Sequence, residues 1–323
     1  MTQCIEIAKT PIGTPEYAFT SVEKCMKKIR ALMEELPEVP DKHAVFAIFK
    51  NSCSSSSMAY LTRTTPRDLI AGHLKEFDAL FKTTFEAIST IAVTERQWLQ
   101  AKLSPSKTGL GMRSLYEHAD ASYVASRLQT HDSCTAIVNS HKWEAEDEAS
   151  PLNKAMRRLN EEHGMGLAYD TSQPIRQQTL SAQIDATTYR QLLDSARDDY
   201  DKAHLKAQEA NGAAWLRALP SEGLDTHLSN RDLIFGIKDR LGVDAFTRVS
   251  RCTYCSFILD TKGIHCRGCM AGGDTTLRHN AIRDLYFQQA RNGRMCPERE
   301  SMKAYSTDPA DPLSQATDDR LIS

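Results

Sequence analysis

Residues 251–293, RCTYCSFILDTKGIHCRGCMAGGDTTLRHNAIRDLYFQQARNG, decide how the C-terminal part of the chain folds. They contain two Cys-x-x-Cys pairs and a histidine next to the second pair, namely Cys252, Cys255, His265, Cys266 and Cys269. One such turn directs two thiolates at a single ion, and a second turn shortly downstream supplies the other ligands of a tetrahedral zinc site. The spacing predicts a zinc knuckle with a C-terminal helix over residues 246–293.

Five candidate side chains compete for four positions around the predicted ion. The preferred ligand set is Cys252, Cys255, His265 and Cys269. Cys266 is the alternate, in a set of four cysteines, because it directly follows His265 and the two are not expected to face the same ion. Four protein ligands leave no open position for an activated water, so the site is expected to be structural. The competing interpretations are reduced, buried cysteines and a redox-active Cys-x-x-Cys pair.

A helix is predicted directly after these ligands, over residues 275–291. Gly272 and Gly273 permit a tight turn, and Asp274 is a favourable N-cap residue. At helical spacing, one face is apolar and consists of Leu277, Ala281, Ile282 and Leu285. An adjoining arc is basic and carries Arg278, His279 and Arg283.

The local charge of this segment favours a nucleic-acid partner, RNA or DNA. Residues 245–294 hold eight Lys or Arg and three Asp or Glu, a balance of +5 in a chain whose net charge is −2. A compact basic patch is typical of phosphate binding, and a solvated helix face is the alternative. The candidate binding residues are Arg267, Arg278, His279 and Arg283. Three aromatic residues can stack on unpaired bases, although we expect at least one to be buried: Tyr254, Phe257 and Tyr286.

The rest of the chain is predicted to be mainly α, with a helical bundle over 19–129, a helical linker over 130–245 and a disordered tail over 294–323. A capping-box pattern at Thr20 and Glu23 starts the first helix, and Thr65-Pro66 starts another. The stripe of that second helix is Leu69, Ile70, Leu74, Phe77, Phe81 and Phe85. Asn230 or Asp232 is the expected cap of a helix over 233–241, and the charged run 194–206 is expected to be a solvated helix face. The lone His118 is expected to be structural.

Composition limits the compartment. Of the 323 residues, 41% are hydrophobic and 25% charged, as in ordinary soluble proteins. The longest apolar run, residues 44–49, is too short to span a membrane, and the N-terminus lacks the apolar core of a secretory signal. Nine cysteines without such a signal indicate a reducing, intracellular location, nuclear or cytoplasmic.

The order of these motifs resembles the C-terminal region of non-long-terminal-repeat retrotransposon reverse transcriptases of the restriction-like-endonuclease type. The matching residues of the knuckle are Cys252, Cys255, Gly263, His265, Cys269, Gly272, Gly273, Asp274, Arg278, His279, Asn280, Arg283 and Asp284. Upstream, the segments 11–13, 63–66, 109–114 and 214–216, the last with 220–221, follow in the same order. The resemblance implies a remnant of the region after the polymerase palm over 1–18, a thumb-like bundle, and a knuckle that helps to hold element RNA or target DNA.

The same resemblance implies that catalytic residues are missing. The only paired aspartates, Asp198-Asp199 and Asp318-Asp319, lack the apolar strand flanks of a polymerase metal site, and no nuclease follows Arg294. We therefore expect a non-catalytic, nucleic-acid-binding fragment with a structural zinc site. The alternatives are a zinc-dependent protein adaptor, an accessory part of a reverse transcriptase that is completed by a protein partner in trans, and a non-functional relic.

Overall fold

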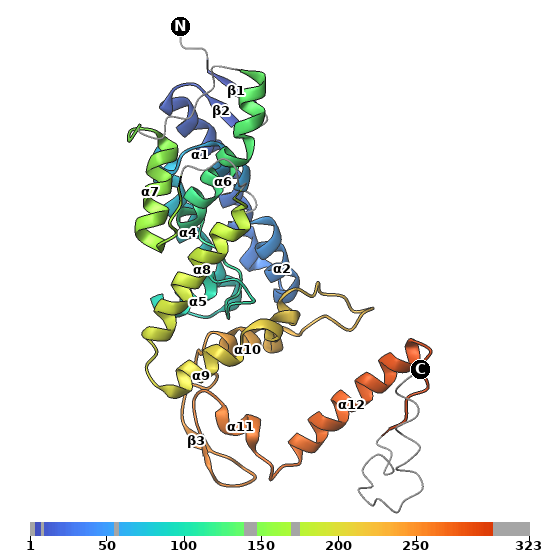
Figure 1. Ribbon diagram of the computed structural model, residues 1–323. Helices are drawn as coiled ribbons and strands as arrows, with labels where there is room; N and C mark the ends of the chain where they lie inside the picture. Colours follow the sequence, from blue (N-terminus) through green and yellow to red (C-terminus); the bar gives the residue numbers. More distant parts are fainter. Residues whose placement is uncertain (1–3, 8–9, 55–57, 139–146, 169–174, 300–323) are drawn as a thin grey trace, which may run out of the picture. The chain divides into compact units, whose positions relative to one another are not determined.

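The computed structural model describes residues 4–7, 10–54, 58–138, 147–168 and 175–299, and these are mainly helical, as predicted (Figure 1). The chain divides into two compact units, residues 1–245 and 246–323. The first contains β1 (Ile5–Ile7), β2 (Thr10–Ile12), α1 (Pro15–Glu35), η1 (Leu36–Glu38), α2 (Lys42–Ser52), α3 (Ala59–Thr64), α4 (Arg67–Ser89), α5 (Glu95–Lys102), α6 (Leu115–Ile137), α7 (Pro151–His163), α8 (Gln177–Asp194), α9 (Asp199–Ala207), η3 (Ala210–Leu216) and α10 (Asn230–Arg240). The second contains β3 (Ser250–Arg251), β4 (Ile258–Leu259), α11 (Ile264–Gly268) and α12 (Asp274–Asn292).

The core of the first unit is built around α4, which packs between α1 and α6. Five of the six predicted members of the α4 stripe are buried, each at most 1% exposed: Ile70, Leu74, Phe77, Phe81 and Phe85. Phe81 stacks on Phe49 of α2, with ring centroids 4.3 Å apart. The sixth predicted member, Leu69, is 45% exposed, because its position turns it out of the face that meets α1 and α6.

Several helices begin at residues other than those predicted. Helix α1 starts at Pro15, capped by the Thr14 side chain, so that Thr20 lies inside the helix and its hydroxyl donates to the Glu16 carbonyl. The cap of α10 is Ser229, whose hydroxyl accepts the backbone N–H of Asp232 at 3.2 Å. The predicted cap Asn230 instead accepts the backbone N–H of Lys42, 188 residues earlier, which periodicity within one helix does not reveal.

The predicted boundary between bundle and linker, at residue 129, falls inside α6. Helices α7 and α8 pack against α6, and Leu180 and Ile184 of α8 share one apolar cluster with Val124. The linker is therefore part of the same unit. The charged run 194–206 is also not one solvated face, because it spans the end of α8 and most of α9, and Asp201 is buried beside Arg96 at 3.0 Å.

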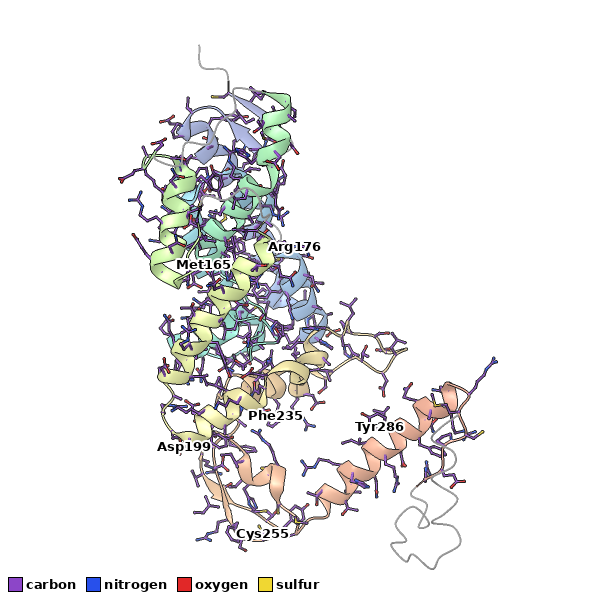
Figure 2. All side chains as sticks on the ribbon, in the orientation of Figure 1. Met165, Arg176, Asp199, Phe235, Cys255 and Tyr286 are labelled. Carbon is purple, nitrogen blue, oxygen red and sulfur yellow. The ribbon has the colours of Figure 1, made fainter. Side chains whose placement is uncertain are left out.

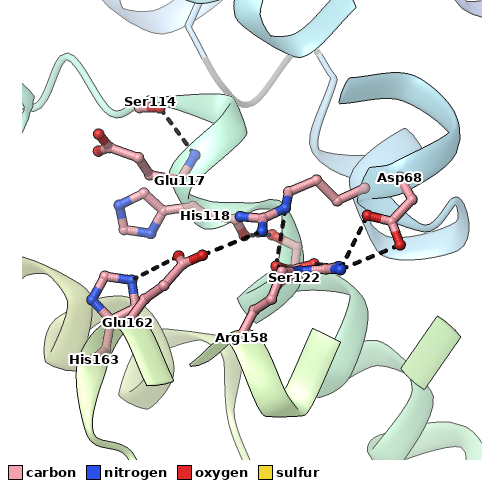
Figure 3. A network of polar contacts seen from close by, with 10 residues as sticks. Asp68, Ser114, Glu117, His118, Ser122, Arg158, Glu162 and His163 are labelled. Carbon is pink, nitrogen blue, oxygen red and sulfur yellow. Dashed lines mark hydrogen bonds and ion pairs between the residues drawn. The ribbon is translucent and has the colours of Figure 1, made fainter. Parts of the chain in front are cut away.

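A buried charge network lies where α4, α6 and α7 meet (Figure 3). The carboxylate of Asp120, which is 1% exposed, accepts two hydrogen bonds from Arg158, at 2.8 and 2.7 Å. Arg67, itself 6% exposed, approaches the same carboxylate at 3.1 Å and Glu162 at 3.5 Å. Arg158 also donates to Asp68 at 3.0 Å. The charges compensate one another, which is the condition for ions to be buried.

His118 lies beside this network, facing α8. Its Nδ1 is 3.3 Å from the Ser181 hydroxyl, and its Nε2 is 3.7 Å from a carboxylate oxygen of Asp185. Burial lowers the pKa of His118 well below its usual value, which keeps the imidazole neutral. These contacts are with side chains of α8, and a structural role for His118 stays a prediction.

Two long-range polar contacts fix the segment before α6. Asp78 of α4 accepts the backbone N–H of Leu115 at 2.8 Å, so one helix caps the N-terminus of another. Arg240, at the end of α10, donates to the carbonyls of Gly109 at 2.8 Å and Pro105 at 2.6 Å. Gly109 is required there, because a Cβ would lie 2.0 Å from the carbonyl oxygen of Leu103.

Candidate metal centre

The second unit begins with a short antiparallel hairpin of β3 and β4, in which Arg251 pairs with Ile258. At its turn the backbone N–H of Cys252 donates to the carbonyl of Phe257 at 2.9 Å. The chain reverses at Ser256, which has a φ of 63°, in the left-handed region. This conformation brings Cys252 and Cys255 to the same side of the hairpin, as a two-thiolate turn requires.

The other two candidate ligands come from α11 and its end. His265 lies in the first turn of α11, and Cys269 is the residue that follows the helix. The start of α11 is anchored by Asp260, whose carboxylate accepts the backbone N–H groups of Ile264 and His265 at 3.1 Å each. Asp260 was not predicted to have this role, although an aspartate shortly before a helix start is a recognised capping signal.

The structure brings Cys252, Cys255, His265 and Cys269 together, with ligand atoms all within 4.8 Å of one another. Sγ of Cys269 lies 3.8 Å from Sγ of Cys252 and 3.7 Å from Sγ of Cys255, and Sγ of Cys255 lies 3.1 Å from Nε2 of His265. A tetrahedral ion with metal–sulfur bonds of about 2.3 Å separates its sulfur ligands by about 3.8 Å. The cluster thus has the dimensions to hold a metal ion. Cys266 is exposed and is not one of the four.

The local electrostatics favour a thiolate at one corner of the cluster. Hydrogen bonds lower the pKa of the Cys252 thiol to about 6. The largest contribution is from the backbone N–H of Tyr254, and smaller ones are from the backbone N–H of Cys255 and the side chain of His265. The backbone N–H of Phe257 acts in the same direction on Cys255, but burial and the neighbouring thiols outweigh it, and the pKa of Cys255 is raised. A cation would stabilise the charged form of every thiol in the cluster.

The candidate phosphate-binding residues are distributed over α11 and α12. Arg267, Arg278 and His279 are exposed. The guanidinium of Arg278 donates to the backbone carbonyl of Arg267 at 2.7 Å, which joins the two helices. Arg283 is half-buried and donates to Asp284 at 3.0 Å, so its charge is partly compensated.

The apolar side chains of this unit are largely exposed, and the expectation that at least one of its three aromatic residues is buried is wrong. The predicted apolar face of α12 is open, with Leu277, Ile282 and Leu285 between 55% and 65% exposed. Tyr254, Phe257 and Tyr286 are all more than 60% exposed, and Tyr286 projects from α12 (Figure 2). The reason is size, since β3, β4 and α11 have two, two and five residues and are too short to cover the 19 residues of α12.

The start of α12 also differs from the prediction. The helix begins at Asp274, and the residue in the cap position is Gly273, with a φ of 73°. A left-handed residue there reverses the chain between Cys269 and α12, and glycine adopts this conformation without a steric penalty.

No protein-family model matches the chain, and no curated protein or solved structure does either. The resemblance to retrotransposon reverse transcriptases therefore stays a prediction from the motifs. No helix in the described part of the chain has the length and apolar character to cross a membrane. The predicted disordered tail lies outside the described residues from 300 onward.

Proposed function

We propose that residues 246–293 form a zinc-stabilised module that binds RNA or DNA without catalysing a reaction. The observation that supports this most directly is the four-residue Cys/His cluster, joined to α12 through the contact between Arg278 and Arg267. Three thiolates and a neutral imidazole suit Zn²⁺ and fill its tetrahedral positions. The bound ion would act as a structural staple, and the reduced thiols that it needs fit a nuclear or cytoplasmic location.

The charge of the module supports phosphate as its ligand. Residues 245–294 carry a balance of +5, and a zinc ion with three thiolates lowers this by about one. The exposed guanidinium groups of Arg267 and Arg278 belong to neighbouring helices that are tied by a hydrogen bond. Guanidinium groups that the fold positions in advance lose less entropy when they bind phosphate. On the family resemblance, the natural ligand is element RNA or target DNA.

The metal is tested on the purified full chain by elemental analysis. We expect about one zinc per chain, with Cys269→Ser losing most of it. Cys266→Ser is the matched control, because this cysteine is adjacent in sequence but exposed and outside the cluster of four. A wild-type protein without zinc, or equal loss in both variants, would contradict the assignment.

Binding is tested by fluorescence anisotropy with labelled RNA and DNA probes over a range of salt concentrations. The slope of log K against log salt is negative, and each lost phosphate contact reduces its magnitude by about 0.7 to 0.9. The double variant Arg267→Ala with Arg278→Ala is therefore expected to reduce the magnitude by about 1.5. Arg190→Ala with Arg231→Ala removes the same charge from exposed positions in the first unit and serves as the control. An unchanged slope, or the same decrease in the control, would refute the proposed interface.

A further inference from the structure

Two aromatic rings occupy the turn that carries the first two candidate ligands, and both face solvent. Tyr254 is 66% exposed and Phe257 is 71% exposed. Exposed aromatic rings are costly to leave in water, and here they alternate with Cys252 and Cys255 in a rigid turn. Each ring has a neighbour in or next to the cluster of candidate ligands: Tyr254 lies against Gly272, and Phe257 lies near His265.

The ring of Tyr254 lies flat against the backbone of Gly272. A Cβ at Gly272 would lie 3.2 Å from Cδ2, 3.3 Å from Cε2 and 3.3 Å from Cγ of Tyr254. Nearly equal distances to three adjacent ring carbons place that point above the face of the ring rather than beside its edge. Glycine at 272 thus lets the ring approach the backbone closely, while Tyr254 as a whole stays 66% exposed.

The ring of Phe257 lies beside a candidate metal ligand and nearly parallel to its imidazole. Its centroid lies 5.9 Å from that of His265, and the two planes are inclined by only 15°. The Cys255 thiol lies 3.1 Å from Nε2 of His265, so the imidazole beside Phe257 belongs to the cluster. Both exposed rings therefore lie against or beside residues in or next to the cluster of candidate ligands.

We infer that this module selects unpaired RNA or DNA, stacking one base on Tyr254 and one on Phe257 while the exposed arginines contact phosphates. The inference rests on the proposed function and specifies its ligand. Bases in a duplex have both faces covered by their neighbours, so only an unpaired strand offers free faces to these rings. Stacking of this kind tolerates any base, which predicts a preference for strandedness and none for sequence.

The test compares three probes of equal phosphate number with the zinc-loaded full chain at one salt concentration. They are an oligothymidylate, the same strand with abasic sites at its centre, and an adenine–thymine duplex with half as many base pairs as the strand has nucleotides. We expect the intact strand to bind about tenfold or more tightly than either of the others. Equal affinity for all three would overturn the inference but leave the proposed function standing, whereas no binding to any probe would overturn both.

Variants separate stacking from folding. Tyr254→Ala with Phe257→Ala is expected to weaken binding to the intact strand by about fivefold or more per ring and to leave binding to the abasic strand unchanged. Tyr254→Phe with Phe257→Tyr keeps both rings and should retain the preference. Phe19→Ala, which removes a 55% exposed ring from α1, is the control. Zinc content is measured for each variant. If the alanine variant loses its metal, the comparison of the three probes with the wild-type protein tests the stacking inference.

Discussion

Replacing Asp120 by alanine tests whether the buried charge network holds the first unit together. The substitution removes the acceptor of two hydrogen bonds from Arg158 and the nearest carboxylate of Arg67. Arg67 is 6% exposed, so its charge cannot recover full hydration without local unfolding. It keeps Glu162 at 3.5 Å and the ring of Tyr116 below its guanidinium, which offset part of the loss.

The expected cost follows from burial. Removing one partner of a buried ion pair costs about 3–5 kcal/mol, because a desolvated charge is left uncompensated. For a unit of this size, each kcal/mol lowers the melting temperature by about 2–4 °C, which gives a decrease of roughly 6–20 °C. The exposed pair Lys82–Glu95 offers a comparison, since Glu95 is 89% exposed and Glu95→Ala should cost less than about 1 kcal/mol.

The assay is urea and thermal unfolding followed by far-ultraviolet circular dichroism, which reports mainly on the helices of the first unit. Both variants keep the same number of residues and lose one negative charge, so they differ in burial. If Asp120→Ala is no less stable than Glu95→Ala, the network contributes nothing beyond a surface ion pair, and the reasoning from burial fails.

Two further predictions concern the knuckle turn and a buried carboxylate. Ser256 has a φ of 63°, which is unfavourable for a residue with a Cβ, so Ser256→Gly should stabilise the knuckle by about 1 kcal/mol. The chelator concentration that removes half the zinc should then rise. A fall in that concentration would show that the turn is unstrained. Burial, opposed by hydrogen bonds from Ser114 and Leu115, raises the pKa of Asp78 to about 6, against about 4 in unfolded chains. The folded state binds this proton more tightly, so its stabilising effect is complete below about pH 4 and is lost as pH rises through about 6, by up to about 3 kcal/mol. Asp78→Asn should abolish this pH dependence in urea titrations, and an unchanged profile would contradict it.

Periodicity predicted the face of α4 but not the environment of α12. In both helices apolar residues recur at helical spacing, yet Leu74 is fully buried and Leu277 is 65% exposed. The pattern tells which residues share a face. Whether another element covers that face depends on the tertiary arrangement, and α4 has α1 and α6 as neighbours.

The candidate metal ligands were predictable because they are close in sequence, from Cys252 to Cys269, and their spacing reflects a local geometry. The buried charge network around Asp120 was not predictable from the sequence. Asp120 and Arg158 are 38 residues apart, in a chain with 42 acidic and 40 basic residues, and composition singles out no pair among them. The aromatic rings were recognised as candidates for stacking, but their support by Gly272 and His265 required the folded turn.

The contacts of Arg240 have a consequence for how the chain tolerates cleavage. This side chain reaches carbonyls of Gly109 and Pro105, 131 and 135 residues earlier, while Leu233 and Ile237 of the same helix lie in the main core. The segment between η3 and α10 includes Leu219 and Leu224, which are 66% and 77% exposed. We expect that the two fragments produced by proteolytic cleavage between η3 and α10 stay associated through the contacts of α10. We also expect that the same two fragments, produced separately, bind each other when mixed.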